Sequence, residues 1–425
     1  MKIKPTSEKA KSASKVSSRS HLRECTPRLR FPGFEGAWSA EYFDDVATGF
    51  EYGLNAAAVD FDGVHKYIRI TDIDDTSHKF IGSPVVSPAG EIDEKYRVRP
   101  NDILLARTGA STGKSYLYDS SDGELYFAGF LIRASVRPEY DARFVFYSTC
   151  TPPYRRWVNM ISMRSGQPGI NAAEYSRHNL NIPTHSEQVQ IGTFLALLDS
   201  KITAQHKLVE ILKKHKRGLS NALFSGKVRM ARNAKWKTYR LSDIVRRVTR
   251  KNGKVSDVPL TISAQYGLID QREFFSKAVA SADMSGYYLL KQGEFAYNRS
   301  SSGEYPFGSI KRLERYNQGA VSTLYICFEV LGDKDDAEFL KWYFDSFAWH
   351  REVGMICAEG ARNHGLLNVP TDGFFDTKHK LPTDKNERKK IATLMALADA
   401  RCEHAETELN RLTTLKSGLL QQLFV

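Results

Sequence analysis

The sequence predicts an α+β protein. Two similar mixed α/β domains are separated by two long helices that form an antiparallel coiled coil, and a pseudo-twofold internal duplication relates the two halves. Three observations predict this fold class. Two segments 200 positions apart are alike, both have a sustained apolar period of 3.5 residues, and the remaining stretches alternate short β-branched or aromatic runs with Gly, Ser and Asn loops. Such a period marks a coiled-coil seam, and such runs mark short strands. Examples of the expected strands are Tyr67–Ile70, Asp102–Leu105, Glu294–Tyr297 and Leu324–Phe328.

The duplication is the strongest of these observations. Residues 187–224 and 387–424 align without gaps, and 12 of the 38 positions are identical. Unrelated segments of this length share about two or three identities by chance, so the period of the repeat is half of the chain. The sequence therefore predicts the order tail, domain, helix, domain, helix.

Landmarks outside the helices recur in the same order. Trp38 precedes Pro183 by 145 residues, and Trp236 precedes Pro382 by 146 residues. These spacings set the expected boundaries. We expect a basic disordered tail over residues 1–26, a first domain over 27–183, a central helix over 184–226, a second domain over 227–381 and a distal helix over 382–425.

The two repeated segments have the pattern of long helices. Each follows a Pro-Thr pair and carries a glutamate in its first turn, Glu187 or Glu387, as is typical of a helix start. A helix of 38 residues spans about 57 Å. The predicted coiled-coil interface consists of Ile191, Leu195, Leu198, Ile202, Val209, Leu212, Leu219 and Leu223 in the first segment, and of Ile391, Met395, Leu409, Leu412, Leu419 and Leu423 in the second.

Each helix has one apolar seam, so the other copy is the expected partner. The pattern persists for five heptads, which is longer than an average helix of ~10–14 residues. Antiparallel pairing is favoured. The alternative, in which each helix packs only on its own domain, stays open at this point.

Composition excludes several classes of protein. No apolar run approaches the ~18 residues that a membrane span needs, and the Lys/Ser-rich start is not a secretory signal. Five scattered cysteines without a CxxC pair argue against disulfides and zinc, and they predict a reducing, cytoplasmic location without membrane association. The net charge is +12, but residues 1–30 hold nine basic and two acidic residues and so contribute seven of these charges. Charge alone therefore does not identify a nucleic-acid-binding protein.

Polar and basic loops interrupt the expected strands of both domains. Arginine, lysine, amide and hydroxyl side chains are those that reach base edges and phosphates in DNA complexes. The candidate DNA-binding residues are Arg107, Thr108, Ser111, Lys114, Arg164 and Gln167 in the first domain, and Arg299, Ser301, Arg362 and Asn363 in the second.

Two motifs resemble catalytic sites and are rejected. Gly109–Ser115 has three residues between its glycines where a phosphate-binding P-loop has four. Thr151–Tyr154 resembles the Asn-Pro-Pro-Tyr loop of adenine methyltransferases, but threonine departs from that pattern, and we interpret the segment as a loop–helix junction. No metal-ligand spacing and no complete catalytic site is found, so the sequence predicts no catalytic residue, no metal site and no cofactor in this chain.

The expected geometry indicates a function. Two similar domains on a stiff rod can bind two similar sites at a fixed separation, and half-sites on one face of B-DNA lie about 34 Å apart. A rod of about 57 Å is long enough to hold that spacing.

Several stretches resemble the specificity (S) subunit of type I restriction–modification enzymes. The resemblance covers about Pro27 to the C-terminus. It rests on the entry run Arg28–Trp38, on the run from Ile182 to Leu219 with its repeat from Leu381 to Phe424, and on Arg362–Val369.

The resemblance implies two target-recognition domains, over 27–183 and 227–381, joined by two long conserved helices. It also implies a bipartite double-stranded DNA target with a nonspecific spacer. The implied partners are two modification (methyltransferase) subunits and restriction (translocase and endonuclease) subunits. AdoMet, ATP and Mg²⁺ are then expected on those partners, and the methyltransferase flips the target adenine out of the stack.

Two other functions remain alternatives. A non-DNA coiled-coil scaffold or adaptor that presents two protein-binding domains is compatible with the modest charge of the chain after its tail. An enzyme acting through Thr151–Tyr154 is the other alternative, and it requires that the isolated chain binds AdoMet.

Overall fold

The computed structural model describes residues 26–163, 166–230, 235–263, 266–274, 283–303, 305–357, 365 and 367–425. These residues divide into two compact units. We call the residues up to 205 together with 408–425 the first unit, and residues 206–407 the second unit. The expected tail, residues 1–26, lies outside the described residues except for Thr26.

A four-stranded antiparallel sheet forms the centre of the first unit, with the strand order β2-β9-β6-β7. Its strands are β2 (Ala47–Tyr52), β9 (Leu131–Val136), β6 (Asp102–Ala106) and β7 (Ser115–Leu117). Three strand pairs flank it: β1 (Ser39–Tyr42) with β10 (Asn179–Ile182), β3 (Ala58–Asp60) with β5 (Val86–Pro88), and the parallel pair β4 (Lys66–Ile68) with β8 (Leu125–Phe127). The short helices are α1 (Phe43–Val46), α2 (Ala142–Ser148), α3 (Pro152–Ile161), α4 (Ala172–Ser176), η1 (Ile70–Asp72), η2 (Glu94–Tyr96) and η3 (Ser120–Asp122).

The second unit is built around a sheet with the order β12-β19-β16-β17. Its strands are β12 (Val245–Val248), β19 (Ile326–Val330), β16 (Phe295–Asn298) and β17 (Ser309–Arg312). The flanking pairs are β11 (Trp236–Arg240) with β20 (Lys378–Pro382), β13 (Leu260–Ser263) with β14 (Gly267–Asp270), and β15 (Tyr288–Lys291) with β18 (Gln318–Val321). The short helices are η4 (Leu241–Asp243), α6 (Gln271–Phe274), α7 (Lys334–Asp345), α8 (His350–Ile356) and α9 (Thr371–Asp376).

The two units share one plan. Both central sheets place their first, fourth, second and third strands side by side in that order. In both units a strand near the start pairs with the strand that leads into a long helix: β1 pairs with β10, and β11 pairs with β20. Among the described residues, helices α2, α3 and α4 in the first unit, and α7, α8 and α9 in the second, lie between the last strand of the central sheet and the strand that leads into the long helix. The mixed fold class is confirmed, and the repeated plan supports the duplication that the sequence predicts.

Strand positions agree with the sequence except at two ends. β6 and β16 cover the expected runs almost residue for residue. The run expected from Tyr67 to Ile70 is strand only as far as Ile68, and the run expected from Leu324 begins as strand β19 at Ile326. Leu324 instead lies in a turn.

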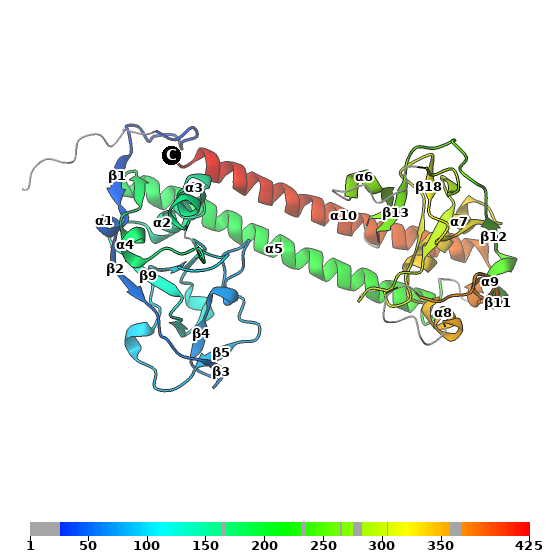
Figure 1. Cartoon of the computed structure of the whole chain (residues 1–425), viewed down its shortest axis with the longest axis horizontal. Coiled ribbons are helices and arrows are strands. Elements are labelled where there is room, and N and C mark those ends of the chain that lie inside the picture. The colour runs from blue at the N-terminus through cyan, green and yellow to red at the C-terminus, as the bar shows by residue number, and fades with distance from the viewer. Residues whose placement is uncertain are drawn as a thin grey trace, which may run out of the picture. The chain divides into compact units, whose positions relative to one another are not determined.

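Two long helices are present, as predicted. Helix α5 covers His185–Phe224 and helix α10 covers Lys385–Gln422 (Figure 1). Every residue of the predicted interface is buried or partly buried. Two lysines interrupt the apolar seam in the sequence, and the structure explains both. In the first unit the ammonium of Lys416 lies 2.7 Å from Oδ1 of Asp199, and in the second unit Lys216 pairs with Asp399.

These pairs fix the direction of packing within each unit. In the first unit the start of α5 packs with the end of α10, and in the second unit the end of α5 packs with the start of α10. The two helices therefore run antiparallel. The alternative that each helix packs only on its own domain is wrong, because Leu195 of α5 and Leu423 from the C-terminal end share the core of the first unit.

Candidate nucleic-acid interface

Two polar loops of the first unit are joined by main-chain hydrogen bonds. The amide of Ile170 donates to the carbonyl of Arg107 (2.9 Å), and the amide of Gly109 donates to the carbonyl of Pro168 (2.9 Å). Thr108 and Gly169 form a β-bridge between these two bonds. We call this paired backbone, residues 107–109 with 168–170, the first loop frame. It brings together two segments that lie about sixty residues apart in the sequence.

Arg107 braces the first loop frame. Its Nε donates to the carbonyl of Gly129 (3.0 Å), and its guanidinium lies 4.9 Å from the centre of the Tyr52 ring and 5.8 Å from that of Phe130. The main-chain amide of Arg107 also donates to the carbonyl of Phe130 (3.0 Å). The side chain thus holds the turn between β8 and β9 against the loop frame.

The other candidates of the first unit differ in how they are held. Gln167 is exposed, and a Cβ placed on Gly109 would lie 3.1 Å from its Nε2, so the amide lies over the loop frame. Thr108 and Ser111 are partly buried in the same loop. Lys114 points away from that surface, because its ammonium is bound by the carbonyl of Ile73 (2.9 Å) and by the carboxylate of Asp75 (2.5 Å).

The second unit repeats the arrangement. The amide of Leu367 donates to the carbonyl of Arg299 (2.9 Å), and the amide of Ser301 donates to the carbonyl of Gly365 (2.6 Å). We call this the second loop frame. The guanidinium of Arg299 also donates, from Nη2 at 2.9 Å, to the main-chain carbonyl of Leu324 in the turn between β18 and β19.

The correspondence between the two loop frames is close. In each, an arginine accepts through its carbonyl, the residue two positions later donates through its amide, and the arginine side chain donates to a turn between two strands. The remaining candidates, Arg164, Arg362 and Asn363, lie outside the described residues.

Sequence reasoning missed one exposed face. Helix α3 directs Tyr154 and Val158 into the core and leaves Met160 exposed. The full exposed set on and after this helix is Arg155, Arg156, Asn159, Met160 and Met163. The equivalent helix α8 exposes Arg351 and Met355. The helical spacing of the buried pair could have revealed this face, because residues four apart share one side of a helix.

The two rejected motifs have structural roles. Gly109–Ser115 connects β6 to β7 in a hairpin, whereas a P-loop leads from a strand into a helix. Gly113 has a φ of +88°, and a Cβ there would lie 2.7 Å from the Val158 side chain. Thr151 is the N-cap of α3, with its hydroxyl accepting from the amide of Tyr154 (3.4 Å), which confirms the loop–helix junction.

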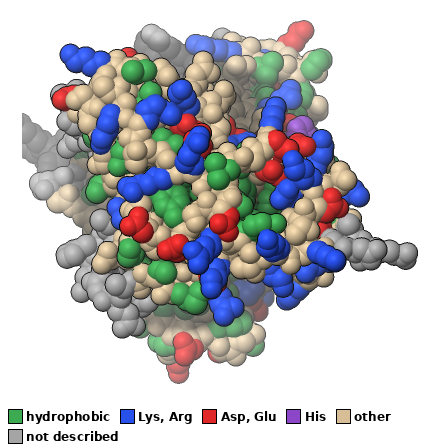
Figure 2. Space-filling view, turned by 90° about the vertical axis from the view of Figure 1, so that its right-hand side faces the viewer, with side chains coloured by type: hydrophobic (Ala, Val, Ile, Leu, Met, Phe, Trp, Pro, Cys, Tyr) green, Lys and Arg blue, Asp and Glu red, His purple; other side chains and the backbone are tan. Residues whose placement is uncertain are grey.

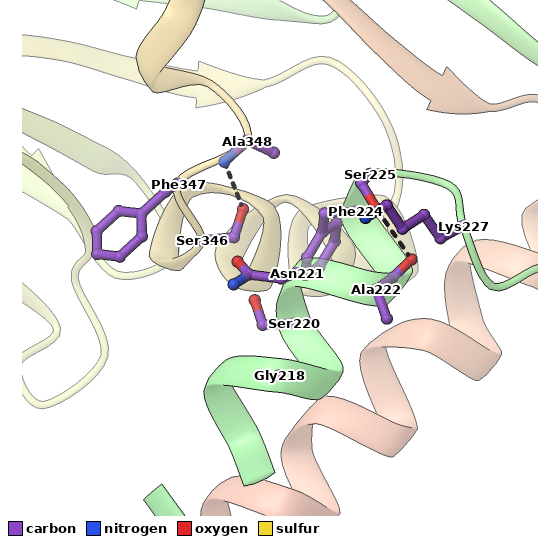
Figure 3. Close-up of a pocket in the computed structure, with 10 residues that line it drawn as sticks. All are labelled: Gly218, Ser220, Asn221, Ala222, Phe224, Ser225, Lys227, Ser346, Phe347 and Ala348. Atoms are coloured by element: carbon purple, nitrogen blue, oxygen red, sulfur yellow. Dashed lines mark hydrogen bonds between the residues drawn. The ribbon is translucent and has the colours of Figure 1, made fainter. Parts of the chain in front are cut away.

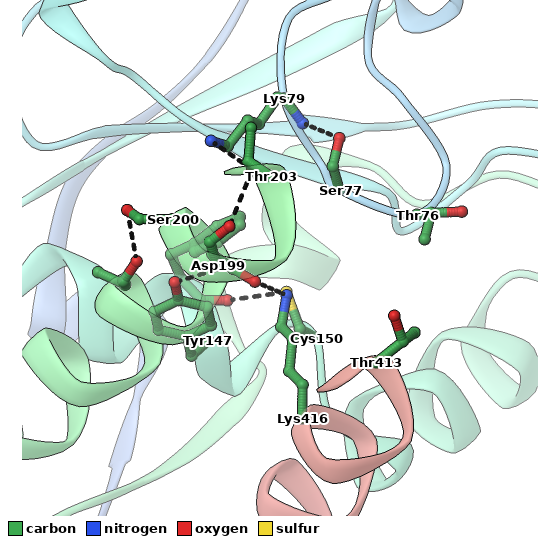
Figure 4. Close-up of polar contacts among 12 residues, drawn as sticks. Thr76, Ser77, Lys79, Tyr147, Cys150, Asp199, Ser200, Thr203, Thr413 and Lys416 are labelled. Carbon is green, nitrogen blue, oxygen red and sulfur yellow. Dashed lines mark hydrogen bonds and ion pairs between the residues drawn. The ribbon is translucent and has the colours of Figure 1, made fainter. Parts of the chain in front are cut away.

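A partly buried ionic cluster joins helix α2 to the long helices of the first unit (Figure 4). The hydroxyl of Tyr147 donates to Oδ2 of Asp199 (2.8 Å), and Lys416 pairs with Oδ1 of the same carboxylate. Burial, and then the neighbouring carboxylate, raises the pKa of Tyr147 well above its usual range. Burial raises the pKa of the adjacent Cys150 thiol to about 11, so it stays protonated near neutral pH and is a poor nucleophile.

A hollow of about 490 Å³ in the second unit lies beside the last turns of α5, between Asn221 and Lys227 on one side and Phe347 on the other (Figure 3). Lysine and arginine side chains are mixed with acidic and apolar ones on the face drawn in Figure 2.

Within the part of the chain that the structure describes, no group of three His, Cys, Asp or Glu side chains is placed to hold a metal ion.

No helix among the described residues is both long and apolar enough to cross a membrane.

Comparisons with known proteins found similar sequences and structures. Residues 54–214 match the family model described as type I restriction modification DNA specificity domain. No curated protein matches the chain.

Solved structures show the fold. The S subunit of a type I restriction-modification system from M. genitalium is 16% identical, covers 94% of this chain and 99% of its own, and has a TM-score of 0.59. A structure concerned with complex assembly and conformational transition of the type I R-M system is 12% identical over 93% of this chain and 98% of its own, with a TM-score of 0.52. The HsdS subunit from Thermoanaerobacter tengcongensis is 14% identical over 93% of this chain and 97% of its own, with a TM-score of 0.47.

The family model spans most of the first unit, including the first loop frame, and the solved structures span both units. The resemblance seen in the sequence is thereby confirmed. Residues 54–214 match the model of the type I restriction modification DNA specificity domain, and the chain has the fold of the type I specificity subunits.

Proposed function

We propose that this chain is the DNA sequence-specificity subunit of a type I restriction–modification complex. Each unit binds one half of a bipartite double-stranded DNA target, and the paired helices set the spacer. The observation that carries the proposal is the repeated loop frame, in which the same main-chain bonds and the same arginine brace occur in both units. One chain thereby presents two rigid and similar loop surfaces that differ in their side chains.

The loop frames are suited to reading bases. Main-chain bonds hold their backbone, so the exposed side chains are positioned before DNA arrives. Gln167 is an amide that can bond both N6 and N7 of adenine, whereas Arg107 and Arg299 stiffen the frame and add positive charge. Phosphate contacts then position each unit, and base contacts specify its half-site.

Partner subunits supply the chemistry in this proposal. The chain is not itself an enzyme, and two methyltransferase subunits with AdoMet, and restriction subunits with ATP and Mg²⁺, assemble on it. Apolar side chains exposed on the long helices support docking of one methyltransferase subunit per unit. They are Phe194, Leu197 and Leu415 in the first unit, and Leu208, Ile211 and Leu397 in the second.

The test compares adenine methylation genome-wide in cells that hold the methyltransferase subunit with and without this chain. The expected result is methylation at one bipartite sequence only when the chain is present. Salt-sensitive binding of the assembled complex to that duplex is expected as well. If the assembled complex protects no specific sequence, the proposal fails and the scaffold alternative is favoured.

The spacer has a separate test. Seven residues inserted at matched positions of α5 and α10 keep the heptad phase and add about 10.5 Å, or roughly 3 bp of B-DNA. The preferred spacer is expected to lengthen accordingly, while both half-sites stay the same. An unchanged spacer would refute the role of the helices in setting it.

A further inference from the structure

Each unit exposes one large apolar side chain at the same place in its fold. Phe130 is the third residue of the turn 128–131 that joins β8 to β9, and Leu324 is the third residue of the turn 322–325 that joins β18 to β19. Phe130 is 59% exposed and Leu324 is 56% exposed. Phe130 is the most exposed aromatic side chain among the described residues.

Both turns are held firmly. Main-chain bonds close them, from the amide of Leu131 to the carbonyl of Ala128 (2.8 Å) and from the amide of Tyr325 to the carbonyl of Ser322 (3.1 Å). The brace arginines bond to the same turns. The backbone from which the two exposed side chains project is therefore held in place beside the loop frames.

Exposure at these positions is not explained by packing. Burying a phenylalanine or leucine side chain is favourable, but single exposed apolar residues are common on proteins. One exposed apolar residue needs no explanation. An exposed apolar residue at the equivalent turn of both units does need one, because the two units otherwise differ in sequence. What the two positions share is an apolar side chain next to a loop frame.

The chemistry of DNA limits what such a side chain can meet. The major-groove edges of the bases present donors, acceptors and one apolar group, the C5-methyl of thymine. We propose that Phe130 in the first unit and Leu324 in the second each contact a thymine methyl group in their own half-site. This inference rests on the proposed DNA-specificity function and names two of its specificity-determining residues.

The test uses the full chain assembled with its methyltransferase subunits and duplexes that carry its target. Each thymine of both half-sites is replaced in turn by deoxyuridine, which lacks only the methyl group, and the dissociation constant is measured at one salt concentration. For the unsubstituted chain, one replacement in each half-site is expected to weaken binding about three- to fivefold, as for the loss of one buried methyl group.

Two variants assign these effects to residues. Phe130→Ala is expected to bind thymine and uracil duplexes equally at the sensitive position of one half-site, and to keep the preference for thymine in the other. Leu324→Ala is expected to do the reverse, so each variant is the matched control of the other. Circular dichroism and thermal unfolding show whether each variant is folded.

The outcomes separate the two proposals. If the chain binds a bipartite target but every uracil replacement is neutral, or if both variants keep the thymine preference, the methyl contacts are refuted and the specificity function stands. If the assembled complex shows no sequence preference at all, the proposed function itself fails.

Discussion

Arg30 donates two hydrogen bonds to the carboxylate of Glu187, from Nε to Oε1 at 2.8 Å and from Nη2 to Oε2 at 2.7 Å. Glu187 lies in the first turn of α5 and is fully buried. The bidentate pair ties the segment before the first sheet to the start of the long helix. The hydrogen bonds to Glu187 raise the pKa of Arg30, which keeps the pair charged.

Arg30→Ala is expected to destabilise the chain strongly. The variant leaves the Glu187 carboxylate buried without its cation, and breaking a buried pair in this way costs about 3–5 kcal/mol. Urea unfolding measures the loss. Adding Glu187→Gln to the first substitution removes the unpaired charge and is expected to restore part of the stability. A single variant as stable as the parent chain would show that the pair contributes little.

Asp199→Asn tests the ionic cluster of the first unit. The substitution leaves the ammonium of Lys416, which is 13% exposed, without its carboxylate partner, and a loss of about 3 kcal/mol in the free energy of unfolding is expected. The double variant with Lys416→Met is expected to recover most of that loss. If the single and double variants unfold alike, the two side chains are not coupled.

Acid sensitivity is expected from a buried histidine of the second unit. Burial lowers the pKa of His379 to about 4, and its two ring nitrogens lie 2.8 Å from the hydroxyls of Tyr343 and Thr377. The folded chain therefore holds the neutral ring. Its contribution to stability is complete above the unfolded pKa of ~6.5 and is lost as the pH falls from there towards 4.

His379→Gln removes this titration. Between pH 7 and pH 5 the parent chain is expected to lose about 2 kcal/mol more than the variant in urea unfolding. Two other histidines, His178 and His350, have pKa values lowered to about 4 by burial, so the variant keeps part of the acid sensitivity. Equal losses in the parent and the variant would contradict the prediction.

Gln167→Ala and Lys114→Ala are expected to separate specificity from stability. Gln167 is exposed over the first loop frame, so its loss is expected to relax one base position at a cost of about 1–3 kcal/mol in discrimination. Lys114 is bound by carbonyls and by Asp75, so its loss is expected to lower the melting temperature and leave the target sequence unchanged. Methylation mapping and thermal unfolding of both variants measure the two effects, and a reversed result would assign the roles the other way.

The long helices could be predicted from the sequence because a heptad pattern is local. The lysines at 216 and 416 looked like interruptions of that pattern, since their aspartate partners lie on the other helix and about 200 residues away. The strands could also be predicted from their β-branched and aromatic residues, but the residues at which they begin and end could not. Leu324 belongs to a turn although its residue type favours a strand.

The candidate site was harder to predict. The loops around Arg107 and Gln167 were found by residue type, but their pairing depends on main-chain bonds that leave no trace in composition. Phe127 and Phe130 stand in one apolar run, yet the first is fully buried and the second is the most exposed aromatic of the described chain. The difference in exposure arises because the chain turns after Phe127, and the position of this turn depends on the surrounding fold.

The loop frames have an evolutionary consequence. Main-chain hydrogen bonds close both frames, and a main-chain bond does not depend on which side chain the residue carries. Exposed side chains of the loop frames can therefore be substituted without loss of the main-chain bonds that hold the frames. In related proteins, a few substitutions of exposed side chains on the loop frames can therefore change the DNA target sequence, while the backbone of the frames stays the same.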